Sequence, residues 1–123
     1  MTTWESGSES NLLDDILAGR KTVEGRLNRD KFAQYKVGDT VNLRRDYRND
    51  AGQLEDGELN AAIVEIVAIR TYPTFLVMVT AEGYQSVIPS AKSADEAADE
   101  YNKYYSDVDQ ARYGVLAIEV RLK

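Results

Sequence analysis

The densest chemistry in the sequence lies in Gly19-Arg20-Lys21-Thr22-Val23-Glu24-Gly25-Arg26, which places an amine, a carboxylate and a guanidinium within six residues. Apolar residues at helical spacing precede this stretch, so Gly19 is expected to end a helix in the left-handed conformation. Lys21 then falls at the junction between the helix and a strand, and its long side chain can swing toward Glu24. Such a set suits a polar ligand that carries a carbonyl group or an anion.

A strand that begins at about Thr22 places the side chains of Thr22, Glu24 and Arg26 on one face, because side chains alternate along a strand. The same residues fit a second interpretation, an ordinary solvated strand edge with surface ion pairs that add little stability. Spacing alone leaves both interpretations open.

The composition excludes several classes of chemistry. Histidine and cysteine are both absent, which removes Ser-His-Asp triads, thiol nucleophiles, disulfides and nearly every zinc site. Carboxylates can hold Mg²⁺ or Ca²⁺, but the sequence gathers no convincing set of them, so we predict neither a metal nor another cofactor. With 123 residues, 43% of them hydrophobic, the chain is expected to form one domain over residues 1–123 around a single core.

No apolar run reaches the length of a membrane span or resembles a signal peptide. We therefore expect a cytoplasmic protein with no membrane contact. A monomer or a weak dimer is expected, since exposed edge strands can pair but no feature demands it.

Charge is distributed unevenly along the chain. The net charge of −6 argues against a general polyanion binder. Residues 20–36 carry six cations and two anions, whereas residues 95–109 carry one cation and six anions. A basic and an acidic face fit a short or single-nucleotide ligand better than a long duplex, although charged faces commonly serve solubility alone.

Helix signals occur at three places. Ser6 and Glu9 have the spacing of a capping box and predict a helix over residues 8–18. Residues 75–82 predict a short helix that Gly83 ends, and a second capping box begins at Ser93. The helix after Ser93 carries a stripe of tyrosines, which we expect to pack against the sheet rather than to stack on bases: Tyr101, Tyr104 and Tyr105.

Strand signals are strongest in the second half of the chain. Residues 59–72 read as a central strand, and residues 115–122 alternate cleanly as a closing strand with Leu116, Ile118, Val120 and Leu122 inward. Shorter strands are expected at residues 2–5 and around residues 41–44. The charged segment 45–58 is interpreted as a long exposed hairpin loop.

The pattern Gly-x-Lys-x-x-Glu-x-Arg, formed by Gly19, Lys21, Glu24 and Arg26, resembles the signature of the ASCH domain family, a branch of the PUA-like small β-barrels. Two further segments resemble that family in the same order along the chain, Val37–Val41 and Tyr113–Ile118. The resemblance implies an α+β fold, a small PUA-like β-barrel of about five to six strands with two to three helices flanking a cleft. It places Lys21, Glu24 and Arg26 in that cleft.

The segment Asp14–Thr22 is similar to the small bacterial N4-acetylcytidine amidohydrolases within this family. The resemblance implies a catalytic lysine at Lys21, a threonine three residues later and a glutamate further downstream. Here Glu24 takes the threonine position, and residues 87–92 contain no counterpart of the glutamate. Glu82 is the nearest carboxylate upstream of them.

Lys21 and Glu24 can nevertheless form a catalytic pair for amide hydrolysis. Burial would raise the pKa of Glu24 while the two neighbouring cations would lower it, and its carboxylate could act as general base toward water. Lys21 would donate a hydrogen bond to the developing oxyanion, a contact of the kind worth on the order of 3 kcal/mol. Four further residues are predicted to bind the substrate: Thr22, Arg26, Arg29 and Tyr84.

Two alternatives to this N4-acylcytidine amidohydrolase stay open. The family also implies a module that binds RNA or a modified nucleotide, with or without ribonuclease activity, in which Lys21, Arg26 and Arg29 would contact the ligand. The second alternative is a protein-interaction domain in which Glu24 and Arg26 pair only to hold the structure. The expected partner of the amidohydrolase is a small-molecule nucleoside, and the RNA-binding alternative adds RNA.

Overall fold

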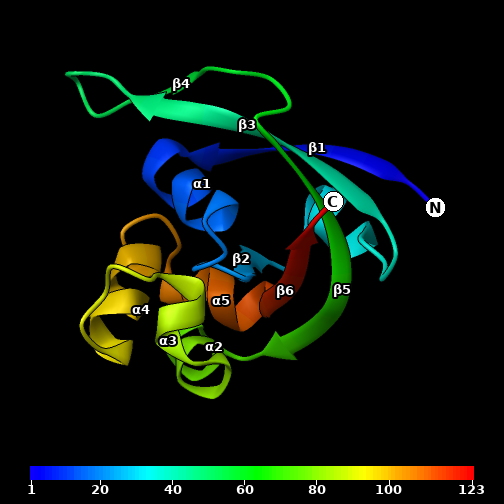
Figure 1. Cartoon of the computed structure of the whole chain (residues 1–123). Coiled ribbons are helices and arrows are strands. Elements are labelled where there is room, and N and C mark those ends of the chain that lie inside the picture. Colours follow the sequence, from blue (N-terminus) through cyan, green and yellow to red (C-terminus); the bar gives the residue numbers. More distant parts are fainter.

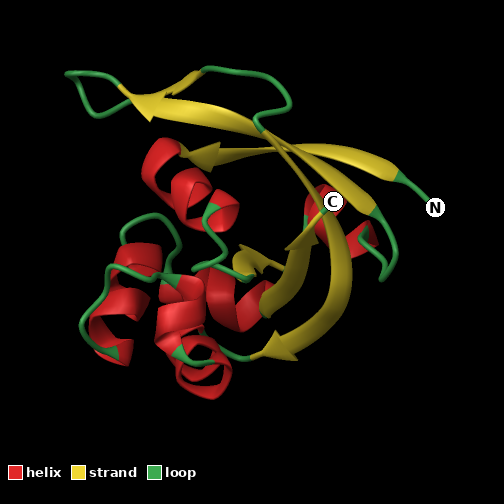
Figure 2. Ribbon diagram, viewed as in Figure 1, coloured by secondary structure: helices red, strands yellow, loops and turns green.

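The computed structural model describes residues 1–123 as one strongly curved sheet with most of its helices gathered on one side (Figure 1, Figure 2). The strand order is β1-β3-β5-β6-β2, with β4 paired to β3 outside this path. Only the β1–β3 pair is parallel. The strands are β1 (Thr3–Glu9), β2 (Val23–Leu27), β3 (Thr40–Arg48), β4 (Leu54–Asp56), β5 (Ala62–Tyr72) and β6 (Val115–Leu122). The helices are α1 (Ser10–Leu17), the 3₁₀ helix η1 (Asp30–Gln34), α2 (Phe75–Glu82), α3 (Tyr84–Val87), α4 (Ala94–Asn102) and α5 (Asp107–Tyr113).

The sheet curls like a barrel but does not close. Its two ends are β1 and β2, which share no backbone ladder. The side chain of Arg26 on β2 reaches across and donates from Nη2 to the carbonyl of Gly7 on β1 at 3.1 Å. The predicted α+β class and PUA-like architecture are confirmed, and the barrel has an open seam between β1 and β2.

One core fills the inside of the curled sheet. Its buried members include Leu13 and Ile16 of α1, which plugs one end, and the inward residues of β3, β5 and β6. Leu116, Ile118 and Val120 point inward as predicted, whereas Leu122 is exposed.

A second core lies between the outer face of β2 and β6 and the helices α2, α3 and α4. Val23 and Leu27 of β2 and Val115 and Ala117 of β6 belong to it. Since alternate side chains of β2 face these helices, Glu24 and Arg26 face the opposite side, toward the inside of the curled sheet and the seam.

Gly25 allows α4 to approach β2 closely. A Cβ atom at this position would lie 2.8 Å from Cζ and Oη of Tyr101 and 2.9 Å from Cε of Met78. Tyr101 in turn stacks on Phe75, with ring centroids 4.3 Å apart and planes 3° from parallel. The glycine thereby sets the distance between β2, the strand that carries Glu24 and Arg26, and the helix α4 packed on the other face of that strand.

Replacing Gly25 by alanine is expected to destabilise the fold by about 1–3 kcal/mol, because the added methyl overpacks this contact. Thermal unfolding of the variant measures the effect. An equally stable Gly25→Ala variant would mean that α4 can move outward freely. Gly52→Ala is not a control for this variant, because Gly52 has a φ of +78°, where an alanine is strained. Ala33→Gly is a control at an exposed position.

Several predicted elements differ from the structure. The capping box at Ser6 and Glu9 is wrong, because both residues lie in β1, where pairing with β3 continues as far as Glu9 opposite Asp46. The segment 45–58 is less of a loop than predicted, since β3 runs on to Arg48 and pairs with β4. The short helices α3 and α5 were not predicted, and Ser106 caps α5 by accepting from the amide of Asp109.

Other local predictions agree with the structure. The helix 75–82 has the predicted bounds, and Ser93 caps α4 by accepting from the amide of Glu96 at 3.1 Å. Gly19 has a φ of +79° after the end of α1, and the closing strand β6 covers residues 115–122. None of the helices is long and apolar enough to cross a bilayer.

Candidate functional site

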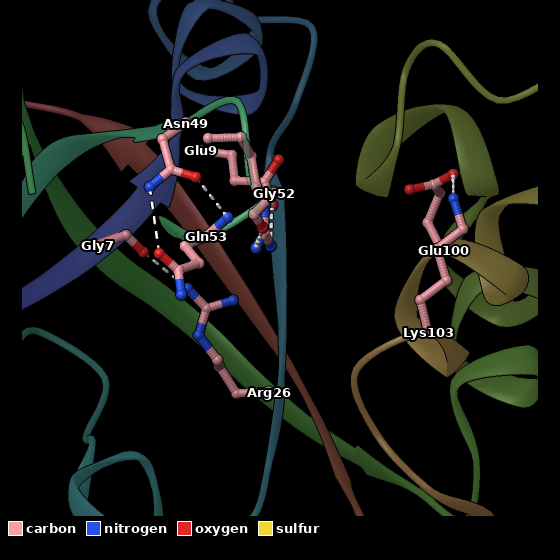
Figure 3. Close-up of polar contacts among 9 residues, drawn as sticks. Gly7, Glu9, Arg26, Asn49, Gly52, Gln53, Glu100 and Lys103 are labelled. Atoms are coloured by element: carbon pink, nitrogen blue, oxygen red, sulfur yellow. Dashed lines mark hydrogen bonds and ion pairs between the residues drawn. The ribbon is translucent and has the colours of Figure 1, made fainter. Parts of the chain in front are cut away.

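A cavity of about 590 Å³ opens at the seam between β1 and β2. One wall comes from β1, β2, η1 and the β3–β4 hairpin, and the other comes from α4 and the segment after α3. Figure 3 shows these two sides, with Arg26 beside Gly7 on the strand side and, opposite, Glu100 of α4 with Lys103 just after the helix. Lys21, Glu24 and Arg26 all line this cavity, so the structure brings together three of the six residues predicted for the site.

Lys21 is a buried amine in the cavity wall, with 2% of its surface exposed. Its Nζ donates to the carbonyl of Val23 at 2.7 Å and to the carbonyl of Val87 at 2.5 Å. These bonds tie the turn after α1 to α3, and no carboxylate is paired with the amine. An ammonium has three protons, so one donor of Lys21 has no partner in these two bonds.

The pKa of Lys21 lies below its ordinary value, chiefly because burial disfavours the charged amine. The positive charge of Arg26 acts in the same direction, while Glu24 and Asp15 oppose it. A lysine in such surroundings gives up its proton more readily than a surface lysine.

Glu24 is buried beside two cations, with 8% of its surface exposed. Its Oε2 lies 3.0 Å from Nη1 of Arg26, whereas its Oε1 is buried without a hydrogen-bond partner. Burial acts to raise the pKa of Glu24, but the charges of Lys21 and Arg26, together with side-chain hydrogen bonds from Arg26 and Ser8, outweigh it and lower the pKa. The carboxylate is therefore ionised at neutral pH.

Arg26 is held in one position by contacts on several sides. Besides Glu24 and the Gly7 carbonyl, its Nη1 donates to the carbonyl of Gly25 at 2.8 Å. Its guanidinium also lies over the ring of Phe32, 5.3 Å from the centroid. Arg26 thus orients Glu24 and bridges the two edges of the seam.

The strand-side rim of the cavity is rich in cations. Arg44 forms an ion pair with the buried Asp46 at 2.6 Å. Lys31 donates to the backbone carbonyl of Glu5. Near the hairpin, Arg48 pairs with Glu9 at 2.6 Å. Of these rim cations, only Lys31 belongs to the basic segment 20–36 that the sequence predicted.

Arg48 also reaches the helix side. Its guanidinium lies over the ring of Tyr104, in the turn after α4, 4.8 Å from the centroid. The contact joins the end of β3 to this turn across the cavity, and we call the Arg48–Tyr104 pair the bridge.

The α4 wall contributes tyrosines and carboxylates. Tyr101 is buried on the core side, as the packing interpretation predicted, yet Tyr101, Tyr104 and Tyr105 all border the cavity as well. Glu96 and Glu100 line the same wall. Both are carboxylates that follow residues 87–92 in the chain and border the cavity.

Three predicted substrate-binding residues lie elsewhere. Thr22 is exposed outside the cavity, with its backbone paired to Ser86 and Val120. Arg29 lies over the ring of Tyr113 at 5.3 Å and 3.7 Å from a carboxylate oxygen of Asp109.

Tyr84 packs against the outer core, and neither it nor Glu82 lines the cavity. Glu82 is bound instead by Arg70 and by the hydroxyl of Tyr72, each at 2.6 Å.

Sequence reasoning missed several residues of the cavity. Asp46 and Arg48 fell in the segment predicted as an exposed loop, and Lys31, Phe32 and Arg44 were not singled out. The sequence carries no apolar alternation that signals the longer strand, because four of the five residues from Arg44 to Arg48 are charged.

No three acidic side chains come together as a set of metal ligands. The hydrogen-bond donors beside Glu24 at the cavity are instead the guanidinium of Arg26 and the amine of Lys21.

An open, curled sheet plugged by one helix, with a cleft at its seam, defines a PUA-like small-barrel domain. The model of the ASCH domain family matches residues 9–123. The chain therefore belongs to the ASCH domain family, which confirms the resemblance seen in its sequence.

Solved structures share this fold over nearly the whole chain. The crystal structure of the hypothetical protein PH0355 is 31% identical, with a TM-score of 0.81 over 98% of this chain and 99% of that one. The solution structure of PF0455 from Pyrococcus furiosus is 32% identical, with a TM-score of 0.73 over 98% and 96% of the two chains.

A crystal structure of an ASCH domain from Lactobacillus crispatus JV V101 is 13% identical, with a TM-score of 0.66 over 98% of this chain and 79% of that one, and shows the fold alone. No curated protein is significantly similar to the chain in sequence.

Proposed function

We propose that this ASCH domain is a metal-independent amidohydrolase that removes acyl groups from N4-acylated cytidine or cytosine derivatives, with Lys21 and Glu24 as its catalytic pair. One observation carries the proposal: a buried lysine with a free donor direction and an ionised, buried carboxylate line the same cavity. Perturbed titratable groups of this kind are typical of active sites rather than of solvated strand edges.

The cavity suits a nucleoside. Its volume of about 590 Å³ is in the range of small-molecule sites. Phe32 on one wall and Tyr104 on the other offer aromatic surface to a base, and the surrounding charged groups offer hydrogen bonds to a ribose or an amide. Both features support a ligand of the size of N4-acetylcytidine.

In the proposed reaction Glu24 takes a proton from water, and the water oxygen bonds to the amide carbonyl carbon. The carbonyl oxygen becomes an oxyanion, to which the third proton of the Lys21 ammonium donates. Glu24 then gives its proton to the N4 nitrogen as the carbon–nitrogen bond breaks. The products are a carboxylic acid and the free cytosine amine, and Glu24 is again a carboxylate.

The direct test is hydrolysis of N4-acetylcytidine by the purified protein, followed by ultraviolet absorbance with EDTA present. Turnover that persists in EDTA supports the proposal. If neither N4-acetylcytidine nor longer N4-acyl derivatives are hydrolysed, the proposal is overturned.

The pH dependence distinguishes the roles of the two catalytic groups. Lys21 must be protonated to stabilise the oxyanion, and its pKa lies below the ordinary 10.5. We therefore expect kcat/KM to fall as the pH rises through the lowered pKa of Lys21. On the acidic side, kcat/KM should be kept down to a pH below 4.5, the ordinary pKa of a glutamate, because the pKa of Glu24 is lowered. A rate that instead rises along the alkaline limb would make neutral Lys21 the base.

Removing the Arg48–Tyr104 bridge tests whether this part of the cavity wall contributes to substrate binding. Arg48→Ala removes the contact that fixes Tyr104 at the cavity, and we expect KM to rise about two- to five-fold with kcat unchanged, because holding that wall in place then costs substrate binding about the 0.5–1 kcal/mol of one exposed cation–π contact. Steady-state kinetics measures both constants, with Arg121→Ala on the far side of the sheet as the control. A lower kcat with unchanged KM would contradict a role in binding alone.

The cationic rim favours a second function, binding of RNA or a modified nucleotide. Lys31, Arg44 and Arg48 lie beside the aromatic surface of Phe32 and Tyr104, and such a combination binds single-stranded nucleic acid through phosphate and stacking contacts. An RNA titration at two salt concentrations tests it. Binding that weakens with salt and with Lys31→Ala, without any turnover of acylated cytidine, would favour this function.

A further inference from the structure

Three cations that line the main cavity meet at the middle of β1, the strand at one end of the sheet. Lys31 of η1 donates to the carbonyl of Glu5, and Arg26 of β2 donates to the carbonyl of Gly7 at 3.1 Å (Figure 3). Arg44 of β3 lies against the same glycine, where a Cβ atom would be 2.6 Å from its Nη2. Three distant segments of the chain thus bring positive charge to one strip of the cavity wall.

Two of these three cations have a carboxylate partner. Oε2 of Glu24 lies 3.0 Å from Arg26, and Oδ1 of Asp46 lies 2.6 Å from Arg44. Lys31 forms no ion pair, and its side chain bonds only to a backbone carbonyl. The cluster therefore carries one positive charge without a partner, which an anion would neutralise.

The charges of the cluster act on one another. The pKa of Lys31 lies below its ordinary value, first because of partial burial and then because of the positive charges of Arg26 and Arg44. The carboxylate of Glu5 acts in the opposite direction without reversing the shift. The effect of both arginines on Lys31 indicates that the three charges are close enough to share one ligand.

Hydrogen-bond donors remain available for such a ligand. Nζ of Lys31 uses one of its three protons. In Arg44, Nε and Nη2 face Asp46 and Asp56, whereas Nη1 has no partner. A compact ammonium beside a guanidinium is a combination that suits the oxygens of a phosphate group.

The opposite wall of the cavity limits the ligand to a single anionic group. Glu96 and Glu100 of α4 line this wall, and neither forms an ion pair with a cation of the strand side. Glu100 pairs instead with Lys103 at 2.8 Å. A nucleic-acid chain that continued across the cavity would bring its next phosphates toward these carboxylates, so the charge distribution favours one phosphate over several.

We propose that Lys31, Arg44 and Arg26 form a subsite for one phosphate group, and that the substrates of this site are cytosine mononucleotides rather than free nucleosides. Arg26 also contacts Glu24, so the phosphate subsite adjoins the proposed catalytic pair. The choice of cytosine rests on the proposed hydrolysis, whereas the phosphate subsite does not.

Calorimetric titration of the purified protein with cytidine 5′-monophosphate and with cytidine tests the subsite. Both ligands lack the acyl group, so the comparison needs no turnover. We expect the monophosphate to bind about tenfold more tightly, because only its phosphate can form charge-assisted hydrogen bonds with the cluster. If the monophosphate binds no more tightly than cytidine, or if neither ligand binds, the proposal is overturned.

Lys31→Met is the variant that assigns this preference to the cluster. It is a better choice than a change at Arg44, which would leave the buried Asp46 without its ion-pair partner. We expect the preference for the monophosphate to fall about five- to tenfold, as for the loss of one hydrogen bond to a charged group. Lys36→Met is the matched control, since Lys36 is exposed and outside the cavity. An equal preference in the two variants would contradict a phosphate subsite at Lys31.

Two further ligands separate this proposal from the others. A short oligocytidine without a terminal phosphate that binds more tightly than the monophosphate would overturn the mononucleotide and favour RNA. With N4-acetylcytidine 5′-monophosphate, kcat/KM should exceed that for N4-acetylcytidine by a factor similar to the preference in binding. A preference for the monophosphate without hydrolysis would leave the subsite standing and the hydrolysis wrong, and hydrolysis without the preference would mean the reverse.

Discussion

Lys21→Met is expected to reduce kcat for N4-acetylcytidine by about 10²–10³-fold while KM stays within roughly an order of magnitude, as for the loss of a single oxyanion donor. The amine makes its catalytic contact mainly in the transition state, and an interaction of that kind lowers kcat and kcat/KM together. Methionine fills a similar volume and keeps the wall of the cavity in place. Steady-state kinetics of the purified variant measures both constants.

The fold should survive this change. Methionine leaves the carbonyls of Val23 and Val87 without their donor, but it also removes the cost of burying a charged amine. Circular dichroism and thermal unfolding check that the variant is folded. Lys92→Met is the matched control, because Lys92 is exposed and outside the cavity.

The same variant separates the two proposed functions. Under hydrolysis, Lys21→Met binds the substrate and does not turn it over. Under RNA binding, Lys21→Met, Arg26→Met and Lys31→Ala each weaken affinity and reduce its salt dependence. A Lys21→Met variant with full hydrolytic activity would show that the amine serves only to tie α1 to α3.

The parts of the fold that could be predicted from the sequence are those with strong local signals. Gly19 ends α1 because only glycine enters the left-handed region without strain, and Ser93 caps α4 by the expected side-chain bond. The alternation of β6 is visible in the sequence because one of its faces meets the bulky inner core. Each of these depends on residues close together in the chain.

The parts that could not be predicted depend on contacts between distant segments. Ser6 and Glu9 carry a helix signal, but the ladder with β3 takes them into a strand. In the sequence Asp46 is typical of a loop. In the structure its backbone pairs with β4, and Arg44 forms an ion pair with its carboxylate.

The candidate site divides in the same way. Lys21, Glu24 and Arg26 were found because one short motif carries all three. Arg29 continues the same run of cations, but its side chain lies over the ring of Tyr113 and near Asp109 of α5, so sequence proximity misplaced it. Glu96 of α4 was read only as part of an acidic face, because the sequence does not show which segment lies opposite β2.

Removing one member of the Glu24–Arg26 pair is expected to have the largest effect on stability. Arg26→Met leaves a buried carboxylate without its ion-pair partner, a change that typically costs about 3–5 kcal/mol. It also removes the donor to Gly7 across the seam. Chemical denaturation measures the free energy of unfolding. The control Arg121→Met breaks an exposed pair with Glu65, and its effect should lie within about 1 kcal/mol.

The double variant Glu24→Gln/Arg26→Met should recover a large part of that loss, because no buried charge is then left unpaired in the pair. A double variant that is no more stable than Arg26→Met would mean that the loss comes from the seam contact with Gly7 rather than from the stranded carboxylate.

The pH dependence gives the sign of the charge effect. In the unmodified protein the pKa of Glu24 is lowered, so the ion pair adds stability above the ordinary pKa of glutamate, and this stability is lost as the pH falls through the lowered value. In Arg26→Met the carboxylate loses a cation, and its pKa must rise. Protonation then relieves the buried charge, so the cost of Arg26→Met should shrink as the solution is acidified. A cost that is independent of pH would show that Arg26 stabilises the seam by packing and backbone contacts, and that Glu24 depends on Lys21 alone for its charge.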